Sequence, residues 1–123
     1  MEKIKILVVD DEYSFCKSLR IFLEKSGYEV IVATNGEHAL DIIKEDSPAI
    51  MTLDIRMPGM DGYEVLNKAK RLAPDLFIIV ITAIDVPRME ELLEHSGAHV
   101  VLRKPINLGE LSQTIDRFLA DLR

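Results

Sequence analysis

AIMTLDIRMPGMDG, at residues 49–62, is the stretch of sequence that indicates both the fold and the place of a site. Its first five residues are mostly apolar, a pattern typical of a strand covered on both faces in a parallel sheet. Asp54 ends this run, and Pro58, Gly59 and Gly62 then mark a turn-rich connection. Open α/β sheets bind ligands at the carboxyl ends of their strands, so we expect a pocket beside Asp54. Taken alone, Asp54 is explained equally well as a residue that caps a turn.

Four other apolar runs, each followed by a helical pattern, place this strand within a larger sheet. Strict alternation with short connections predicts parallel strands, right-handed crossovers and helices on both faces. We therefore expect an α/β fold, namely a flavodoxin-like, doubly wound, five-stranded parallel sheet in the order 2-1-3-4-5, flanked by five helices. The expected strands span residues 3–9, 29–33, 49–53, 76–81 and 100–102, and Thr82 ends the fourth.

Local signals predict where the helices begin and end. Asp61 and Asn107 precede helical patterns and have the side chains of N-caps, while Gly27 is a typical terminator. In the fourth helix, expected over residues 86–96, Leu92 is one of the residues predicted to face inward.

Length and charge limit the classes of function. A chain of 123 residues is expected to form one domain, residues 1–123, with a core that needs no disulfide. A formal charge of −6 argues against direct nucleic-acid binding and favours protein partners or cations. No signal peptide and no apolar run of membrane-spanning length is apparent, so we expect no membrane insertion and a cytoplasmic location.

The single cysteine is interpreted as a structural residue, and the three histidines as surface or structural residues. Cys16 lies in an amphipathic helical pattern and is expected to be buried or half-buried. His38, His95 and His99 fall outside the strand-end motifs and lack metal-ligand spacing.

Polar residues follow four of the predicted strands, and the strand order brings them to one rim. Like charges crowded at such a rim repel unless a cation lies among them. Oxygen ligands without cysteine or histidine favour Mg²⁺, with Mn²⁺ also acceptable. The alternative is that the first two acidic residues form a solvated turn before a helix. The rim residues are Asp10, Asp11, Asp54, Thr82 and Lys104.

The same residue types suit transfer of a phosphoryl group to an aspartate. Lys104 would act as a point charge for a phosphoryl oxygen, or pair with Asp54 when the site is empty, and Thr82 would donate a hydrogen bond. Asp54 is the candidate nucleophile, and an aspartate ionised near neutral pH needs no general base. Such a reaction depends mainly on positioning and charge neutralisation.

Four short motifs lie in an order and spacing that one family shows: LVVDDE at 7–12, LDIRMPGMDG at 53–62, VITA at 80–83 and LRKPI at 102–106. The sequence resembles the response-regulator receiver domains of two-component signalling over its whole length.

The resemblance implies a phosphorelay. Asp54 would accept a phosphoryl group from a phosphohistidine on a histidine kinase or histidine phosphotransfer protein. Mg²⁺ would be held by Asp10, Asp11, Asp54 and the Arg56 backbone carbonyl, with Thr82 and Lys104 on the phosphoryl oxygens. The resemblance also implies catalysis by the domain of its own phosphorylation and dephosphorylation, and it includes Met57, Pro58, Gly62 and Pro105 in the loops of the site. The Lys104–Pro105 peptide bond is expected to be cis.

One departure concerns the switch that Thr82 would operate. Many receivers have an aromatic residue three positions before the lysine, and this chain has Val101 there. Any output change would then rest on the loop after Thr82 and on the helix expected over 86–96. Arg56 and Ile84 are expected to flank the acceptor and to control the approach of water.

Three other functions compete with the phosphorelay. A small aspartate-dependent phosphatase would usually have a second aspartate two residues after Asp54, where this chain has Arg56. A nucleotide or flavin binder would need glycines after the first strand. The third is an interaction module that is never phosphorylated. The sequence also leaves open a downstream protein target, an effector domain if the receiver is excised from a longer regulator, and a homodimer through the last two helices.

Overall fold

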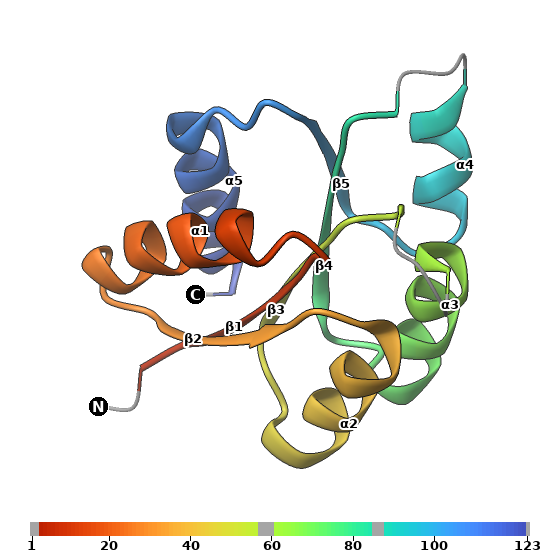
Figure 1. The fold of residues 1–123 in the computed structure, drawn as a ribbon, viewed down its shortest axis with the longest axis horizontal. Coiled ribbons are helices and arrows are strands. Elements are labelled where there is room, and N and C mark those ends of the chain that lie inside the picture. Colours follow the sequence, from red (N-terminus) through yellow and green to blue (C-terminus); the bar gives the residue numbers. More distant parts are fainter. Residues whose placement is uncertain (1–2, 57–60, 85–87, 123) are drawn as a thin grey trace.

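The computed structural model describes residues 3–56, 61–84 and 88–122 of the 123-residue chain. Along these residues five strands alternate with five helices, as the sequence predicts (Figure 1). The elements are β1 (Lys5–Val9), α1 (Tyr13–Lys25), β2 (Glu29–Ala33), α2 (Gly36–Asp46), β3 (Ile50–Leu53), α3 (Gly62–Leu72), β4 (Phe77–Thr82), α4 (Met89–His95), β5 (Val100–Arg103) and α5 (Leu108–Asp121). Met57 and Pro58, two of the predicted loop residues, lie outside the described residues.

The sheet has the predicted topology. Its five strands are parallel and lie in the order β2-β1-β3-β4-β5. Val9, the last residue of β1, pairs with Ala33 of β2 and with Leu53 of β3. Because both β1 and β3 end at this level, the residues that follow them emerge side by side at the carboxyl edge of the sheet.

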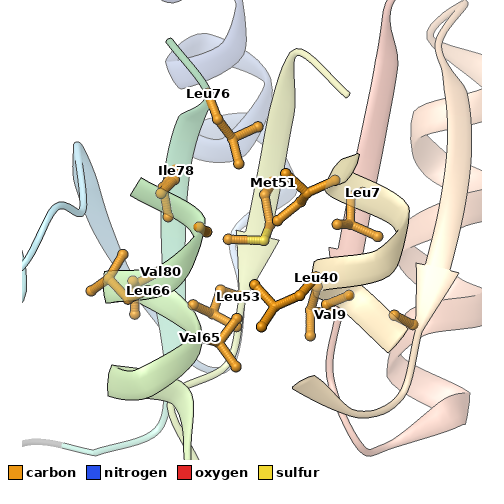
Figure 2. Packing of buried hydrophobic residues seen from close by; sticks show 14 of the residues in the cluster. Leu7, Val9, Leu40, Met51, Leu53, Val65, Leu66, Leu76, Ile78 and Val80 are labelled. Atoms are coloured by element: carbon orange, nitrogen blue, oxygen red, sulfur yellow. The ribbon is translucent and has the colours of Figure 1, made fainter. Parts of the chain in front are cut away.

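Side chains alternate between the two faces of the sheet and build a core on each. The first core lies under α2, α3 and α4, and Figure 2 shows part of it packed between the strands and helices. The second core lies under α1 and α5 on the opposite face (Figure 1). The first core contains Leu7, Val9, Ala33, Ala39, Leu40, Ile42, Ile43, Met51, Leu53, Ile55, Val65, Leu66, Ala69, Leu76, Ile78, Val80, Leu93 and Ala98. The second contains Ile6, Val8, Cys16, Leu19, Leu23, Val30, Ile50, Ile79, Ile81, Leu102, Leu111 and Ile115.

Side-chain caps begin three of the helices. The Asp61 side chain accepts hydrogen bonds from Tyr63 N at 2.6 Å and Glu64 N at 3.3 Å, and Asn107 accepts one from Glu110 N at 3.0 Å. Both predicted N-caps are therefore confirmed. Asn35 caps α2 in the same way, through His38 N at 2.9 Å.

Some element boundaries and one side-chain position differ from the sequence prediction. β3 and β4 each begin one residue later than expected, at Ile50 and Phe77, and β5 extends one residue further, to Arg103. β1 begins at Lys5, two residues later than expected. Leu92, predicted to face inward, is 54% exposed, because in the short helix α4 the neighbouring Leu93 takes the fully buried position. None of the helices that the structure describes is both long and apolar enough to cross a membrane.

Candidate functional site

Three carboxylates meet at the carboxyl edge of the sheet. Asp10 follows β1 and Asp54 follows β3, and the backbone N–H of Asp54 donates to Val9 O at 3.0 Å. One oxygen from each of Asp10, Asp11 and Asp54 lies within 4.8 Å of the others. Asp10 and Asp54 are buried, with 1% and 7% of their surface exposed, whereas Asp11 is exposed. The sequence prediction that these three residues converge is borne out by the geometry.

Backbone donors fix the orientation of the two buried carboxylates. Asp10 Oδ1 accepts a hydrogen bond from Glu12 N at 2.9 Å, and Asp54 Oδ1 accepts one from Arg56 N at 3.1 Å. Each bond joins a residue to the backbone two positions later, so the turn after each strand orients its own carboxylate. The two Oδ2 atoms are then left to face Lys104.

Lys104 bridges both carboxylates. Its Nζ lies 2.7 Å from Asp10 Oδ2, 3.4 Å from Asp54 Oδ2 and 3.7 Å from Glu12 Oε1. The Lys104 backbone N–H donates to Thr82 O at 2.9 Å, which places the residue directly beside the end of β4. The sequence predicted a pair with Asp54, and the structure adds a closer contact with Asp10.

Burial and charge act together on the ionisable groups of the site. Burial raises the pKa of Asp54, and the Asp10 charge adds to this, while the Arg56 N–H and Lys104 oppose it. Burial alone would lower the pKa of Lys104, but the hydrogen bonds and charges of Asp10 and Asp54 raise it. Lys104 is therefore a firmly protonated cation in a negatively charged rim.

Thr82 ends β4 and is completely buried. Its Oγ1 accepts a hydrogen bond from Ile84 N at 3.1 Å, so the hydroxyl is tied to the loop that follows. Val101 is partly buried on β5 and packs against the first core. Thr82 and Val101 thus lie on neighbouring strands, although Val101 provides neither a ring nor a hydroxyl.

Arg103 makes contacts that the sequence does not predict. Its Nη1 donates to Ile84 O at 2.5 Å, and its Nη2 lies 3.2 Å from Glu90 Oε1 in α4. Arg103 therefore joins β5, the loop after Thr82 and α4. Its position directly before Lys104 in the LRKPI motif was the available signal, but that position alone does not indicate a partner.

Cys16 and His99 have the structural roles that the sequence predicts. The Cys16 thiol is fully buried and donates to Asp10 O at 3.3 Å, and burial raises its pKa to about 11. His99 Nδ1 accepts a hydrogen bond from Ile78 N at 3.1 Å, and the ring lies against Phe77 at a centroid distance of 5.0 Å.

Two loop residues have a clear geometric role. A Cβ at Gly62 would overlap the backbone of Ile55, so only glycine permits this close approach of α3 to the chain after Asp54. Gly62 N donates to Ile55 O at 3.1 Å across the same contact. The Lys104–Pro105 bond is cis, as expected.

The carboxylates suit a hard divalent cation. They offer oxygen ligands from three separate side chains within one short span, and an exposed third carboxylate leaves a side open to water. This is the donor chemistry of Mg²⁺, which keeps several waters and takes few protein ligands. The predicted metal ligands Asp10, Asp11 and Asp54 therefore fit such an ion.

Residues 6–116 match the family described as the response regulator receiver domain. This chain belongs to that family. The protein is a receiver domain of a two-component response regulator, consistent with phosphorelay signalling through an aspartate.

Curated relatives of this receiver domain differ in length. Sporulation initiation phosphotransferase F of Bacillus subtilis (strain 168) is 34% identical over 115 residues, which cover 94% of this chain and 93% of that protein. Transcriptional regulatory protein ZraR of Klebsiella oxytoca is 38% identical over 123 residues, which cover 99% of this chain and 28% of that protein. The receiver domain thus matches one relative almost entirely and only part of the other.

Solved receiver structures share the fold. A CheY-like receiver domain protein from Methanospirillum hungatei JF-1 is 30% identical with a TM-score of 0.92, covering 98% of this chain and 96% of that one. A response regulator from Burkholderia pseudomallei, with a phosphorylated aspartic acid, calcium ion and citrate, is 28% identical with a TM-score of 0.83. That match covers 88% of this receiver domain and 64% of the other chain.

Proposed function

We propose that Asp54 accepts a phosphoryl group from a phosphohistidine donor, in a reaction that requires Mg²⁺, and that the modified domain binds its target differently. The donor would be a histidine kinase or a histidine phosphotransfer protein. The observation that carries this proposal is the contact of Lys104 with Asp10 and Asp54 at the end of β1 and β3. A buried carboxylate beside a cation and two further carboxylates suits phosphoryl transfer to aspartate.

The reaction exchanges one bond to phosphorus for another. One oxygen of the Asp54 carboxylate forms the new O–P bond while the N–P bond to the donor imidazole breaks. The electron pair of that bond returns to the imidazole nitrogen. Hydrolysis later transfers the phosphoryl group to water and restores the carboxylate.

Each remaining residue of the site has a proposed part in positioning. Asp10, Asp11, Asp54 and the Arg56 carbonyl would hold Mg²⁺, which neutralises charge on the phosphoryl oxygens when bound. Lys104 moves from Asp54 to a phosphoryl oxygen. The Thr82 hydroxyl, which accepts a hydrogen bond from Ile84 N, donates one to another phosphoryl oxygen and moves away from Ile84 N as it does so.

The Burkholderia pseudomallei protein supports the acceptor chemistry by analogy. Its crystal structure contains a phosphorylated aspartic acid together with a calcium ion. By the same family likeness we propose that this domain accelerates its own phosphorylation and dephosphorylation. We further propose that residues 1–123 act as one phosphoacceptor unit.

Mass spectrometry after incubation with acetyl phosphate and Mg²⁺ tests the acceptor. The wild type should gain the mass of one phosphoryl group and lose this gain when EDTA is added first. Asp54→Asn should gain none. Asp41→Asn is the matched control, because Asp41 is an exposed carboxylate on α2, and it should behave as the wild type does.

The same assay, together with a measurement of released inorganic phosphate, separates the competing functions. A phosphatase would release inorganic phosphate continuously from unrelated phosphate esters. An interaction module that is never phosphorylated would show no gain in mass with any donor. An equal gain in wild type and Asp54→Asn would contradict Asp54 as the acceptor.

A further inference from the structure

The Lys104 ammonium has a neighbour that the phosphorelay proposal does not use. The ring of Phe15 faces it, with Nζ 4.4 Å from the ring centroid. Phe15 is the third residue of α1 and is partly buried against the second core. An ammonium at this distance is attracted by the negative face of the aromatic ring.

We propose that Phe15 is a positioning residue, whose ring face holds the Lys104 ammonium at the rim while phosphoryl transfer occurs. This inference rests on the function proposed above. It adds a residue on α1 to a site otherwise built from the strand ends.

The surroundings of Nζ explain why a ring is useful there. On one side the ammonium is bound by Asp10 and Asp54, at 2.7 and 3.4 Å, with Glu12 at 3.7 Å. The lysine side chain is only 15% exposed, so few waters replace a contact that is lost. The ring occupies another side of the ammonium and reduces its freedom on a long, flexible stem.

The Phe15 ring also differs from the two carboxylates because the proposed reaction leaves it unchanged. In the proposed reaction Asp54 gains a phosphoryl group and Asp10 binds a cation, so both hydrogen bonds of Lys104 are exchanged. Phe15 takes part in neither event and remains available to Nζ throughout. A further acidic residue at this position would add negative charge to a rim that repels a phosphoryl group, whereas the ring attracts the ammonium without net charge.

A purely structural role for Phe15 is the competing explanation, because the ring also packs on the second core. Phe15→Leu keeps an apolar side chain there but removes the ring face. Phe15→Tyr keeps the ring. Phe22→Leu is the matched control, since Phe22 lies on the same helix and packs partly buried on the same core.

Nuclear magnetic resonance tests the contact without any activity. The ring current should move the Lys104 Cε protons upfield in the wild type and in Phe15→Tyr, with the signals assigned from their loss in Lys104→Met. The upfield shift should disappear in Phe15→Leu and persist in Phe22→Leu. Lys104 signals at ordinary positions in the wild type would overturn the inference.

Phosphorylation kinetics test the consequence. The rate constant is measured against acetyl phosphate concentration in Mg²⁺, with the unfolding free energy of every variant measured beside it. We expect the second-order rate constant to fall about three- to tenfold in Phe15→Leu and to stay within about twofold of wild type in Phe15→Tyr and Phe22→Leu.

A folded Phe15→Leu variant with the wild-type rate would overturn the inference, as would equal losses in Phe15→Leu and Phe22→Leu. If the wild type takes up no phosphoryl group at all, the proposed function fails, and the ring-current measurement then decides the Phe15 contact by itself.

Discussion

Lys104 lies closer to Asp10 than to Asp54, with Nζ 2.7 Å from Asp10 Oδ2 and 3.4 Å from Asp54 Oδ2. The shorter bond is therefore made to the carboxylate that is not the proposed acceptor. Lys104 compensates the charge of Asp10 most strongly while leaving Asp54 more weakly bound. A cation that binds these carboxylates must compete with the ammonium for them.

Replacing Lys104 by methionine should make the fold depend on divalent metal. Asp10 and Asp54 are buried and would lose their counterion, so we expect the unfolding free energy to fall by about 2 kcal/mol. Added Mg²⁺ should restore more stability in Lys104→Met than in the wild type, because its competitor is gone. Urea unfolding with Mg²⁺ or EDTA measures both effects. Lys68→Met is the control, because Lys68 and Glu64 form an exposed pair on α3, and an equal Mg²⁺ effect in all three proteins would contradict the prediction.

Arg103 should control how firmly α4 is held. Replacing it by leucine removes the hydrogen bond to Ile84 O and the contact with Glu90. We expect amide exchange in α4 to become about fivefold faster, as the loss of a charged hydrogen bond would allow. Hydrogen–deuterium exchange with mass spectrometry measures this. Arg20→Leu breaks an exposed pair within α1 and should leave α4 unchanged.

Phosphorylation should reach α4 through Thr82 although Val101 is not aromatic. Thr82 Oγ1 holds Ile84 N, and Ile84 O is held by Arg103, so release of the first bond frees a loop that is linked to α4. Exchange over residues 82–104 should therefore differ between the free and phosphorylated protein. Indistinguishable exchange in this segment would show that the chain of contacts does not transmit the change.

His99 should make stability fall in mild acid. Partial burial of the ring, although the residue as a whole is exposed, and the charge of Lys70 lower its pKa from the usual value of 6.5, so the unfolded chain takes up the proton first as the pH falls. The stability that neutral His99 supplies is present above about pH 6.5 and is lost as the pH falls toward the folded pKa. His99→Asn keeps an acceptor for Ile78 N but does not titrate. When the pH is lowered from about 7.5 to about 5, the unfolding free energy of the wild type should fall more than that of His99→Asn. Equal losses would contradict the prediction.

Gly62→Ala should be strongly destabilising. The new Cβ would overlap the Ile55 backbone, which cannot move without shifting the turn after Asp54. We expect a loss of about 3 kcal/mol in unfolding free energy, and slower phosphorylation of the protein that remains folded. At Gly109 in α5 the nearest atom is the Asn107 side chain at 3.2 Å. Gly109→Ala should therefore change stability by less than about 1 kcal/mol, as measured by the same urea titration.

The fold could be predicted from the sequence because its signals are local and repeated. Each strand is an apolar run followed by a helical pattern, and only a few sheet orders satisfy right-handed crossovers. The N-caps Asp61 and Asn107 could also be predicted, because a capping side chain accepts hydrogen bonds from backbone N–H groups only two or three residues further along the chain. Leu92 was placed wrongly because α4 is too short for its pattern to define a buried face.

The site could be predicted as a set of residues but not as a set of contacts. The carboxylates and Lys104 lie at strand ends, and the strand order alone brings them together. The preference of Lys104 for Asp10, the ring of Phe15 and the bonds of Arg103 depend on rotamers and helix placement. The sequence pattern places Phe15 only on the helical face that packs on the sheet, because an aromatic residue at helical spacing is typical of a core.

The buried Cys16 thiol is a natural probe of local opening in this protein. A disulfide reagent reaches the fully buried Sγ when α1 separates from the sheet, and the same separation removes the burial that raises the thiol pKa to about 11 in the closed protein. Because the thiol donates a hydrogen bond to Asp10 O, its labelling rate measures how often α1, which lies beside the acidic rim, separates from the sheet. The opening rate of the wild-type protein can therefore be compared with and without magnesium by measuring Cys16 labelling, and no engineered probe is needed.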